Sequence, residues 1–174
     1  GTVQHCGIYV TPFNTVGHLY ENLPGTFAAA RKNHPLQAIT GAAILLRKAE
    51  FEACGAFHEA YHNGFEDIDL CFSLRARGQK LRVEGRSVVY HHASRTPGRF
   101  AHDMENSVVL MQRVGMAMRP DEHMLASLDG YRLCIGPSLV TWMELPAERQ
   151  QRFNEEFGGA AFDRTVCQVM LQRE

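Results

Sequence analysis

The alternation of apolar and polar positions predicts several short strands. Residues 37–47 are apolar at nearly every position, which is typical of a strand covered on both faces. Pro12 to Thr15, with Gly17, predict a turn. Weaker β-type patterns cover residues 3–10, 80–83, 87–91 and 131–135. We therefore expect a small mixed sheet in which residues 37–47 form the main strand.

Helical patterns alternate with these strands. Residues 66–77 are the clearest case, because apolar side chains recur along them and Gly78 supplies a stop signal. Residues 100–118 place Met104, Val108, Met111 and Val114–Gly115 roughly on one face. Further helices are predicted over 26–33, 48–53, a short segment beginning at 119, 146–157 and 162–171, and 57–64 is a predicted loop.

This mixture predicts an α/β fold. A Pro-Gly break at 97–98 favours a division into an α/β portion, residues 1–99, and a mostly helical extension, residues 100–174. The chain has 174 residues, of which 45% are hydrophobic and 21% charged, with a net charge of −1. This composition is typical of a globular protein, and its balanced charge does not indicate nucleic-acid binding. No apolar run approaches the length that spans a bilayer.

The cysteine pattern argues against a disulfide framework and against a structural zinc site. The five cysteines are scattered, odd in number and without CxxC spacing. We expect reduced thiols in a cytoplasmic protein, and a peripheral membrane association is compatible with that location.

Glu66, Asp67 and Asp69 open the predicted helix at 66–77. The first turn of a helix offers unpaired backbone N–H groups and the positive end of the helix dipole, so carboxylates there stay ionised and held in place. One explanation of such a cluster is stabilisation of the helix start by itself. Motifs on either side of it favour a catalytic role instead.

Those motifs follow one another in a fixed order. They are ITGAAILLRK at 39–48, CGAFHEAY at 54–61, GFEDIDLC at 64–71 and SVVYHHAS at 87–94. In order and spacing, residues 37–99 resemble the acceptor-side half of a family 2 glycosyltransferase of the GT-A fold. The resemblance implies a partial GT-A-like mixed sheet flanked by helices, followed by the helical extension.

The resemblance also implies roles for particular residues. Asp67 corresponds to the general base that deprotonates the acceptor hydroxyl, and Glu66 to a neighbour that orients the acceptor. His91 corresponds to a metal ligand, with His92 as the alternative, because neighbours on a strand point to opposite faces. The implied cation is Mn²⁺ or Mg²⁺, which would neutralise the departing diphosphate in the complete enzyme.

Substrate contacts are expected from Gly41, Ala42, Tyr61, His62 and Arg95. Each has a plainer alternative. The two small residues also suit tight packing, Tyr61 and His62 suit an ordinary packed loop, and Arg95 suits a solvated surface position.

The resembled enzymes begin with a nucleotide-binding half that ends in an Asp-x-Asp motif, and we expect that half to be absent here. The sequence therefore predicts the C-terminal portion of a nucleotide-sugar-dependent inverting glycosyltransferase, inactive alone, which acts on a glycan or protein acceptor. An exposed sheet edge would favour a homodimer. The alternatives are a non-catalytic interaction module and, more weakly, a metal-dependent hydrolase that uses Asp67, Asp69 and the histidine pair.

Overall fold

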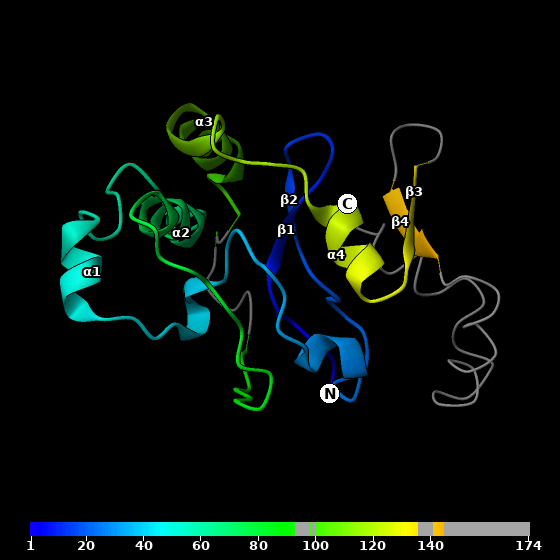
Figure 1. Cartoon of the computed structure of the whole chain (residues 1–174). Helices are drawn as coiled ribbons and strands as arrows, with labels where there is room; N and C mark the ends of the chain where they lie inside the picture. Colours follow the sequence, from blue (N-terminus) through cyan, green and yellow to red (C-terminus); the bar gives the residue numbers. More distant parts are fainter. Residues whose placement is uncertain (93–97, 99, 136–140, 145–174) are drawn as a thin grey trace.

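The computed structural model describes residues 1–92, 98, 100–135 and 141–144 (Figure 1). It confirms a mixed α/β chain. In sequence order the elements are β1 (Ile8–Val10), β2 (Val16–His18), the 3-10 helices η1 (Ala28–Arg31) and η2 (Gly41–Ala43), α1 (Lys48–Ala53), α2 (Glu66–Ala76), α3 (Asp103–Val114), α4 (Glu122–Leu128), β3 (Arg132–Ile135) and β4 (Thr141–Glu144).

The strands form two antiparallel hairpins. In the first, Ile8 lies opposite His18 and Val10 opposite Val16, and the intervening turn is closed by the Thr11 and Thr15 hydroxyls, 2.7 Å apart. The sequence predicted a turn that included Gly17, but this glycine lies within β2. In the second hairpin β3 pairs with β4, which confirms the strand predicted near residues 131–135.

The strand predicted over residues 37–47 is wrong. Ala38 forms an isolated bridge with Ile8, and the chain then leaves the strand direction as the Thr40 hydroxyl accepts a hydrogen bond from Ala42 N and η2 begins. Leu45 is 99% exposed. An apolar run becomes a strand only where a neighbouring backbone pairs with it, and the described residues supply such a neighbour only near Ala38.

The strands predicted over residues 80–83 and 87–91 are also wrong. Leu81 forms a single bridge with Leu36. Val88, Val89 and Tyr90 have β-type side chains but are 69%, 64% and 88% exposed. β-propensity reflects the fit of a side chain to a half-buried sheet surface, and no described strand offers these residues such a surface.

Most of the helices predicted within the described residues are confirmed. α1, α2, α3 and α4 all lie where the sequence placed them, and the helix predicted over 26–33 contracts to η1. α2 ends as predicted, with Gly78 at φ 80° and a hydrogen bond from Gln79 N to Leu74 O. The helices predicted over 146–157 and 162–171 lie outside the described residues.

The apolar face predicted for α3 is turned toward solvent over most of its length, and only its end at Val114 is buried. Met104, Val108 and Met111 are exposed, whereas Asn106 and Leu110 are buried. Asn106 fixes this rotation, because its Oδ1 accepts a hydrogen bond from His62 N and its Nδ2 donates to His62 O. A polar contact with the neighbouring loop therefore decides which side of α3 faces the core.

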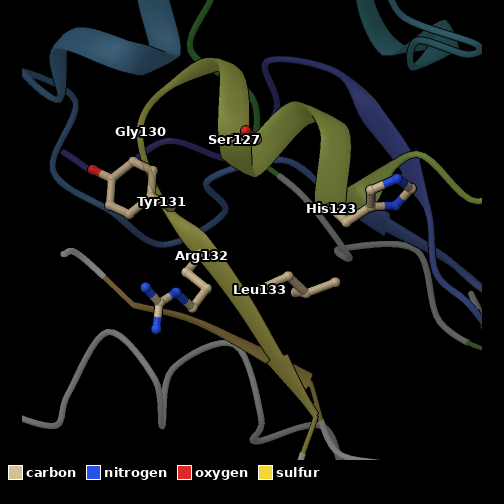
Figure 2. Close-up of a pocket in the computed structure, with 6 residues that line it drawn as sticks. All are labelled: His123, Ser127, Gly130, Tyr131, Arg132 and Leu133. Carbon is tan, nitrogen blue, oxygen red and sulfur yellow. The ribbon is translucent and has the colours of Figure 1, made fainter.

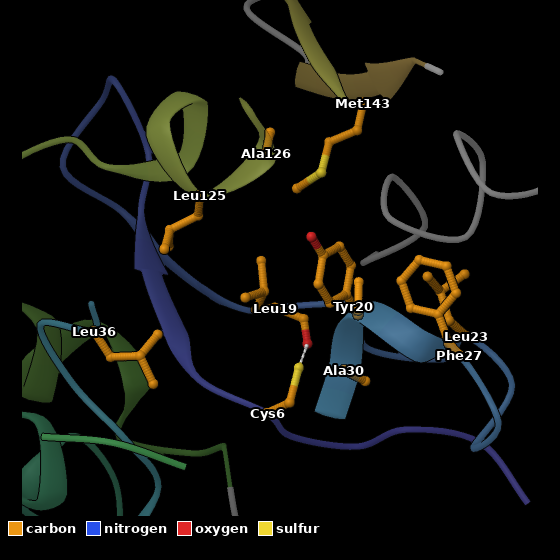
Figure 3. Packing of buried hydrophobic residues seen from close by; sticks show 11 residues of the cluster. Cys6, Leu19, Tyr20, Leu23, Phe27, Ala30, Leu36, Leu125, Ala126 and Met143 are labelled. Atoms are coloured by element: carbon orange, nitrogen blue, oxygen red, sulfur yellow. Dashed lines mark hydrogen bonds between the residues drawn. The ribbon is translucent and has the colours of Figure 1, made fainter. Parts of the chain in front are cut away.

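Two apolar clusters form the core. The first lies beside α4 and η1, and Figure 3 shows most of its side chains: Cys6, Leu19, Tyr20, Leu23, Phe27, Ala29, Ala30, Leu36, Leu125, Ala126 and Met143. The second lies between β1, α2 and α3: Ile8, Val10, Ala38, Tyr61, Ile68, Cys71, Phe72, Leu110, Val114 and Met118. Full burial of one large apolar side chain stabilises the fold by about 1.5–3 kcal/mol.

Both clusters contain residues from before and after position 100, so the described part of the 100–174 region packs on the α/β portion. Asp121, just before α4, reinforces this contact by accepting hydrogen bonds from Val10 N at 2.7 Å and from Gln37 at 2.6 Å. The division at residue 99 stays a prediction. Among the described residues, no helix has the length and apolar character needed to cross a membrane.

Candidate functional site

A strained turn leads into the acidic start of α2. Asn63 and Phe65 adopt left-handed φ angles of 61° and 71°, with Gly64 at 154° between them. Non-glycine residues adopt this conformation at a cost of about 1–2 kcal/mol each. Such strain persists where surrounding structure holds it, which is common at functional sites. The turn fixes the direction from which the chain enters α2.

Glu66 and Asp67 occupy the first turn of α2, as predicted. Glu66 Oε2 accepts a hydrogen bond from Gly64 N at 2.6 Å. Asp67 Oδ1 accepts from Ile68 N at 2.9 Å, and its Oδ2 accepts from Gly41 N at 2.7 Å. The positive end of the helix dipole favours ionised carboxylates here. Asp67 is partly exposed, so its oxygens keep access to a ligand.

Gly41 and Asp67 lie together although 26 residues separate them. A Cβ atom added at Gly41 would lie 3.0 Å from the Cβ of Asp67, which is a very tight contact. The small residue therefore allows the η2 backbone to approach the carboxylate. Sequence reasoning left open whether Gly41 served a ligand or packing, and the structure assigns it a direct contact with Asp67.

A pair of histidines, His5 and His18, contacts the backbone next to Gly41. No sequence pattern predicted this pair. His5 Nε2 accepts a hydrogen bond from Thr40 N at 3.1 Å, and His5 Nδ1 lies 2.8 Å from His18 Nδ1. Burial, followed by the nearby His18, lowers the pKa of His5 from 6.5 to about 3, so His5 is neutral at physiological pH. The β1–β2 hairpin brings the two rings together, and no local sequence motif indicates that pairing.

Asp69 has a different environment from Asp67. It is 2% exposed and accepts hydrogen bonds from Tyr61 OH at 2.8 Å, from Ser73 at 3.4 Å and from Arg113 of α3. The hydrogen bond to Asp69 raises the pKa of the Arg113 guanidinium, so Arg113 stays charged. Asp69 therefore joins α2, α3 and the 57–64 loop.

The other predicted contact residues are dispersed. Tyr61 is buried in the second cluster with its hydroxyl on Asp69, which favours the packed-loop alternative for this residue. Burial, followed by the hydrogen bond to Asp69, raises the pKa of Tyr61. His62 and Ala42 are exposed, and the His62 ring lies 4.9 Å from that of His102. Arg95 lies outside the described residues.

His91 and His92 are both exposed, and His91 Nδ1 lies 2.8 Å from Gln4 Oε1. No three His, Cys, Asp or Glu side chains of the described residues group as a metal site. A divalent cation with hard-ligand preferences needs several oxygen donors, so these residues do not form a complete cation site by themselves. The metal-ligand role of His91 stays a prediction.

A shallow pocket lies at α4 and the start of β3, away from α2 (Figure 2). Its lining is His123, Ser127, Gly130, Tyr131, Arg132 and Leu133. None of the residues predicted from the sequence lies there, so the candidate site is the Asp67–Gly41 contact and its surroundings.

About half of the chain is similar in sequence to parts of two much longer proteins. It is 30% identical over 105 residues to the uncharacterized protein y4gI of Sinorhizobium fredii, which covers 56% of this chain and 11% of that protein. It is 29% identical over 99 residues to the O-antigen biosynthesis protein RfbC of Myxococcus xanthus, which covers 54% of this chain and 8% of that protein. The alignments thus span about a tenth of these relatives. No protein-family model and no solved structure matches the chain.

Proposed function

We propose that this chain is the acceptor-side part of a nucleotide-sugar-dependent inverting glycosyltransferase that acts in polysaccharide assembly. The similarity to an O-antigen biosynthesis protein supports the biosynthetic setting. The observation that carries the proposal is the state of Asp67, a partly exposed carboxylate at a helix start whose hydrogen-bond donors are backbone amides. The family 2 resemblance of residues 37–99 points to the same aspartate.

In this proposal Asp67 accepts the proton of an acceptor hydroxyl as that hydroxyl attacks the anomeric carbon of the sugar. Each Asp67 oxygen accepts one backbone hydrogen bond, which leaves a lone pair on each for the acceptor. The same backbone donors fix the direction of the carboxylate. Glu66, held against Gly64 N, orients the acceptor beside it.

The donor site and any divalent cation require residues from outside this chain. His91 would contribute one nitrogen ligand, and carboxylates of the nucleotide-binding half would supply the others. The cation would neutralise charge on the leaving diphosphate. The chain by itself is therefore proposed to be inactive, at a cytoplasmic location.

The test is glycosyl transfer by the complete protein, measured with a panel of nucleotide sugars and a lipid-linked glycan extract as acceptor. Asp67→Asn should lower turnover by about 10²–10⁴-fold, because a general base contributes that much, while donor binding measured by calorimetry stays intact. Asp103→Asn, in the first turn of α3, is the matched control and should keep full turnover. Undiminished turnover in Asp67→Asn would refute the assignment.

A non-catalytic interaction module is the second candidate, and exposed apolar residues favour it. Met104, Val108 and Met111 lie along α3 with 78%, 49% and 40% exposure, and the 88–90 segment is also exposed. Exposed apolar side chains that gather along one helix are typical of contact sites. Sedimentation of the chain as a strict monomer that gains no partner when the remaining part of the protein is added would count against it. Nothing in the described residues favours the hydrolase, because Asp69 is engaged by Arg113 and no three metal ligands group together.

A further inference from the structure

A chain of hydrogen bonds connects the β1–β2 hairpin to the candidate base. It begins at His18, passes through the 2.8 Å contact to His5 and continues to the backbone of Thr40 at 3.1 Å. The next amide along the backbone, Gly41 N, donates to Asp67 Oδ2 at 2.7 Å. Four segments that are distant in sequence thus meet through one series of polar contacts.

The geometry fixes the proton positions in this chain. A backbone N–H can only donate, so His5 Nε2, which faces Thr40 N, carries a lone pair rather than a proton. A neutral His5 therefore holds its proton on Nδ1, from where it donates to His18 Nδ1. The edge-to-face arrangement of the two rings, with centroids 5.0 Å apart, is consistent with this in-line contact. The lowered pKa of His5, about 3, supports the neutral form.

We propose that His5 and His18 are positioning residues for Asp67: the pair holds the Ile39–Thr40 peptide through Thr40 N–H, so that the next amide along the chain, Gly41 N–H, is placed to fix the carboxylate toward the acceptor. This inference rests on the proposed function where it treats Asp67 as the base. Neither histidine touches the reacting atoms. Their effect passes through the backbone of one residue, Thr40, and the small size of Gly41 permits the close approach.

Two substitutions at one position separate this role from general packing. In His5→Gln, the side-chain oxygen reaches the place of Nε2 and keeps an acceptor for Thr40 N. In His5→Asn, the shorter amide reaches the place of Nδ1, keeps a contact with His18 and removes the acceptor from Thr40. His123→Asn, at an exposed position on α4, is the control for histidine loss.

The first readout is nuclear magnetic resonance of the full 174-residue chain at pH 7. We expect the Gly41 amide proton to lie downfield in the wild type and in His5→Gln, and to lose this shift in His5→Asn. Hydrogen exchange at Gly41 should accelerate at least about tenfold in His5→Asn. A Gly41 amide that is unchanged in His5→Asn would overturn the inference.

The wild-type imidazole ¹⁵N shifts give a second test that requires no variant to fold. His5 Nε2 should show the shift of an unprotonated nitrogen and Nδ1 that of a protonated one. A proton on His5 Nε2 would overturn the inference, because such a nitrogen cannot accept from Thr40.

Turnover of the complete protein connects the contact to catalysis. We expect kcat to fall about 10–100-fold in His5→Asn with KM little changed, since a displacement near 1 Å costs up to about 10²-fold, and His5→Gln to stay within about threefold of the wild type. Equal loss in both variants would indicate packing instead and would overturn the positioning role. If Asp67→Asn itself retains turnover, the proposed function fails, while the Gly41 amide still decides whether the histidine pair holds the peptide.

Discussion

Asp67 and Asp69 lie two residues apart on the same helix, yet they differ in burial and in the kind of hydrogen-bond donor that holds them. Asp69 is 2% exposed and is enclosed by side chains from α3 and the 57–64 loop, including the charged Arg113. Asp67 is partly exposed and is held by backbone amides, including that of Gly41. One carboxylate connects elements of the fold, and the other is oriented but left accessible.

The difference shows what separates a structural carboxylate from a candidate reactive one. A charge-paired, fully enclosed carboxylate has no free direction from which to accept a substrate proton, and its removal leaves a buried partner unsatisfied. A carboxylate held by backbone donors keeps its position while one side of it stays open to a ligand. The following changes test this contrast, beginning with the largest expected effect.

Asp69→Asn should destabilise the chain by about 1–3 kcal/mol, because the buried Asp69 would lose its charge-assisted hydrogen bonds, while solvent around the partly exposed Arg113 reduces the cost of the lost ion pair. Asp67→Asn should cost about 1 kcal/mol or less, since it removes a helix-end charge while keeping an acceptor for Gly41 N. Urea denaturation midpoints measure both. Equal losses in the two variants would contradict the contrast.

Acidification should weaken the support behind Asp67 in a defined pH window. The pKa of His5 is about 3 in the folded chain against 6.5 ordinarily, so between these values the unfolded chain binds a proton that the folded chain does not. Stability is therefore full above pH 6.5 and falls as the pH drops toward 3, by at most about 1.4 kcal/mol per pH unit. His5→Gln should lack this part of the slope in urea titrations at stepped pH. An unchanged slope would show that His5 is not the group responsible.

Gly41→Ala should separate the η2 backbone from Asp67, because the new Cβ would lie 3.0 Å from the Asp67 Cβ. We expect a loss of about 1 kcal/mol, at the lower end of the usual cost of overpacking. Calorimetric melting measures it, with Ala42→Ser at the neighbouring exposed position as the control expected within about 0.5 kcal/mol of the wild type. Melting as in the wild type would show that the close approach is not required.

Ala56→Gly tests backbone strain away from the two aspartates. Ala56 adopts a left-handed φ of 61°, as Phe65 does at 71° before the acidic turn. Glycine relieves this strain but gains entropy in the unfolded chain, so the net stabilisation should be under about 1 kcal/mol. Thermal melting measures the gain, and the Gly41 amide should keep its wild-type shift. A lower melting temperature would show that the turn is not strained.

Asp129, another enclosed carboxyl group, shows that the environment of a carboxylate depends on residues distant in the sequence. Asp129 accepts hydrogen bonds from His34 at 2.6 Å, from Lys32 at 2.7 Å and from Tyr20. Burial by itself would raise the pKa of Asp129, but these donors outweigh it and lower the pKa. Its partners lie about a hundred positions earlier in the chain, and no spacing in the sequence indicated them.

The sequence by itself determined the elements whose signals lie within a few residues of one another. The position of α2, its acidic first turn and its end at Gly78 follow from apolar spacing, the helix dipole and the left-handed preference of glycine. The mixed α/β class follows from the same short-range patterns. The predictions for 37–47, 80–83 and 87–91 failed because a strand needs a partner backbone, and apolar composition does not supply one.

Only the tertiary structure decided which acid is enclosed and which is accessible. Arg113 reaches Asp69 across 44 residues, and Gly41 reaches Asp67 across 26. The His5–His18 pair exists because the first hairpin folds back on itself. Hydrogen-bond partners of this kind are set by how elements pack rather than by neighbouring residues, so the local sequence places a carboxylate on a helix and the packed fold determines its environment.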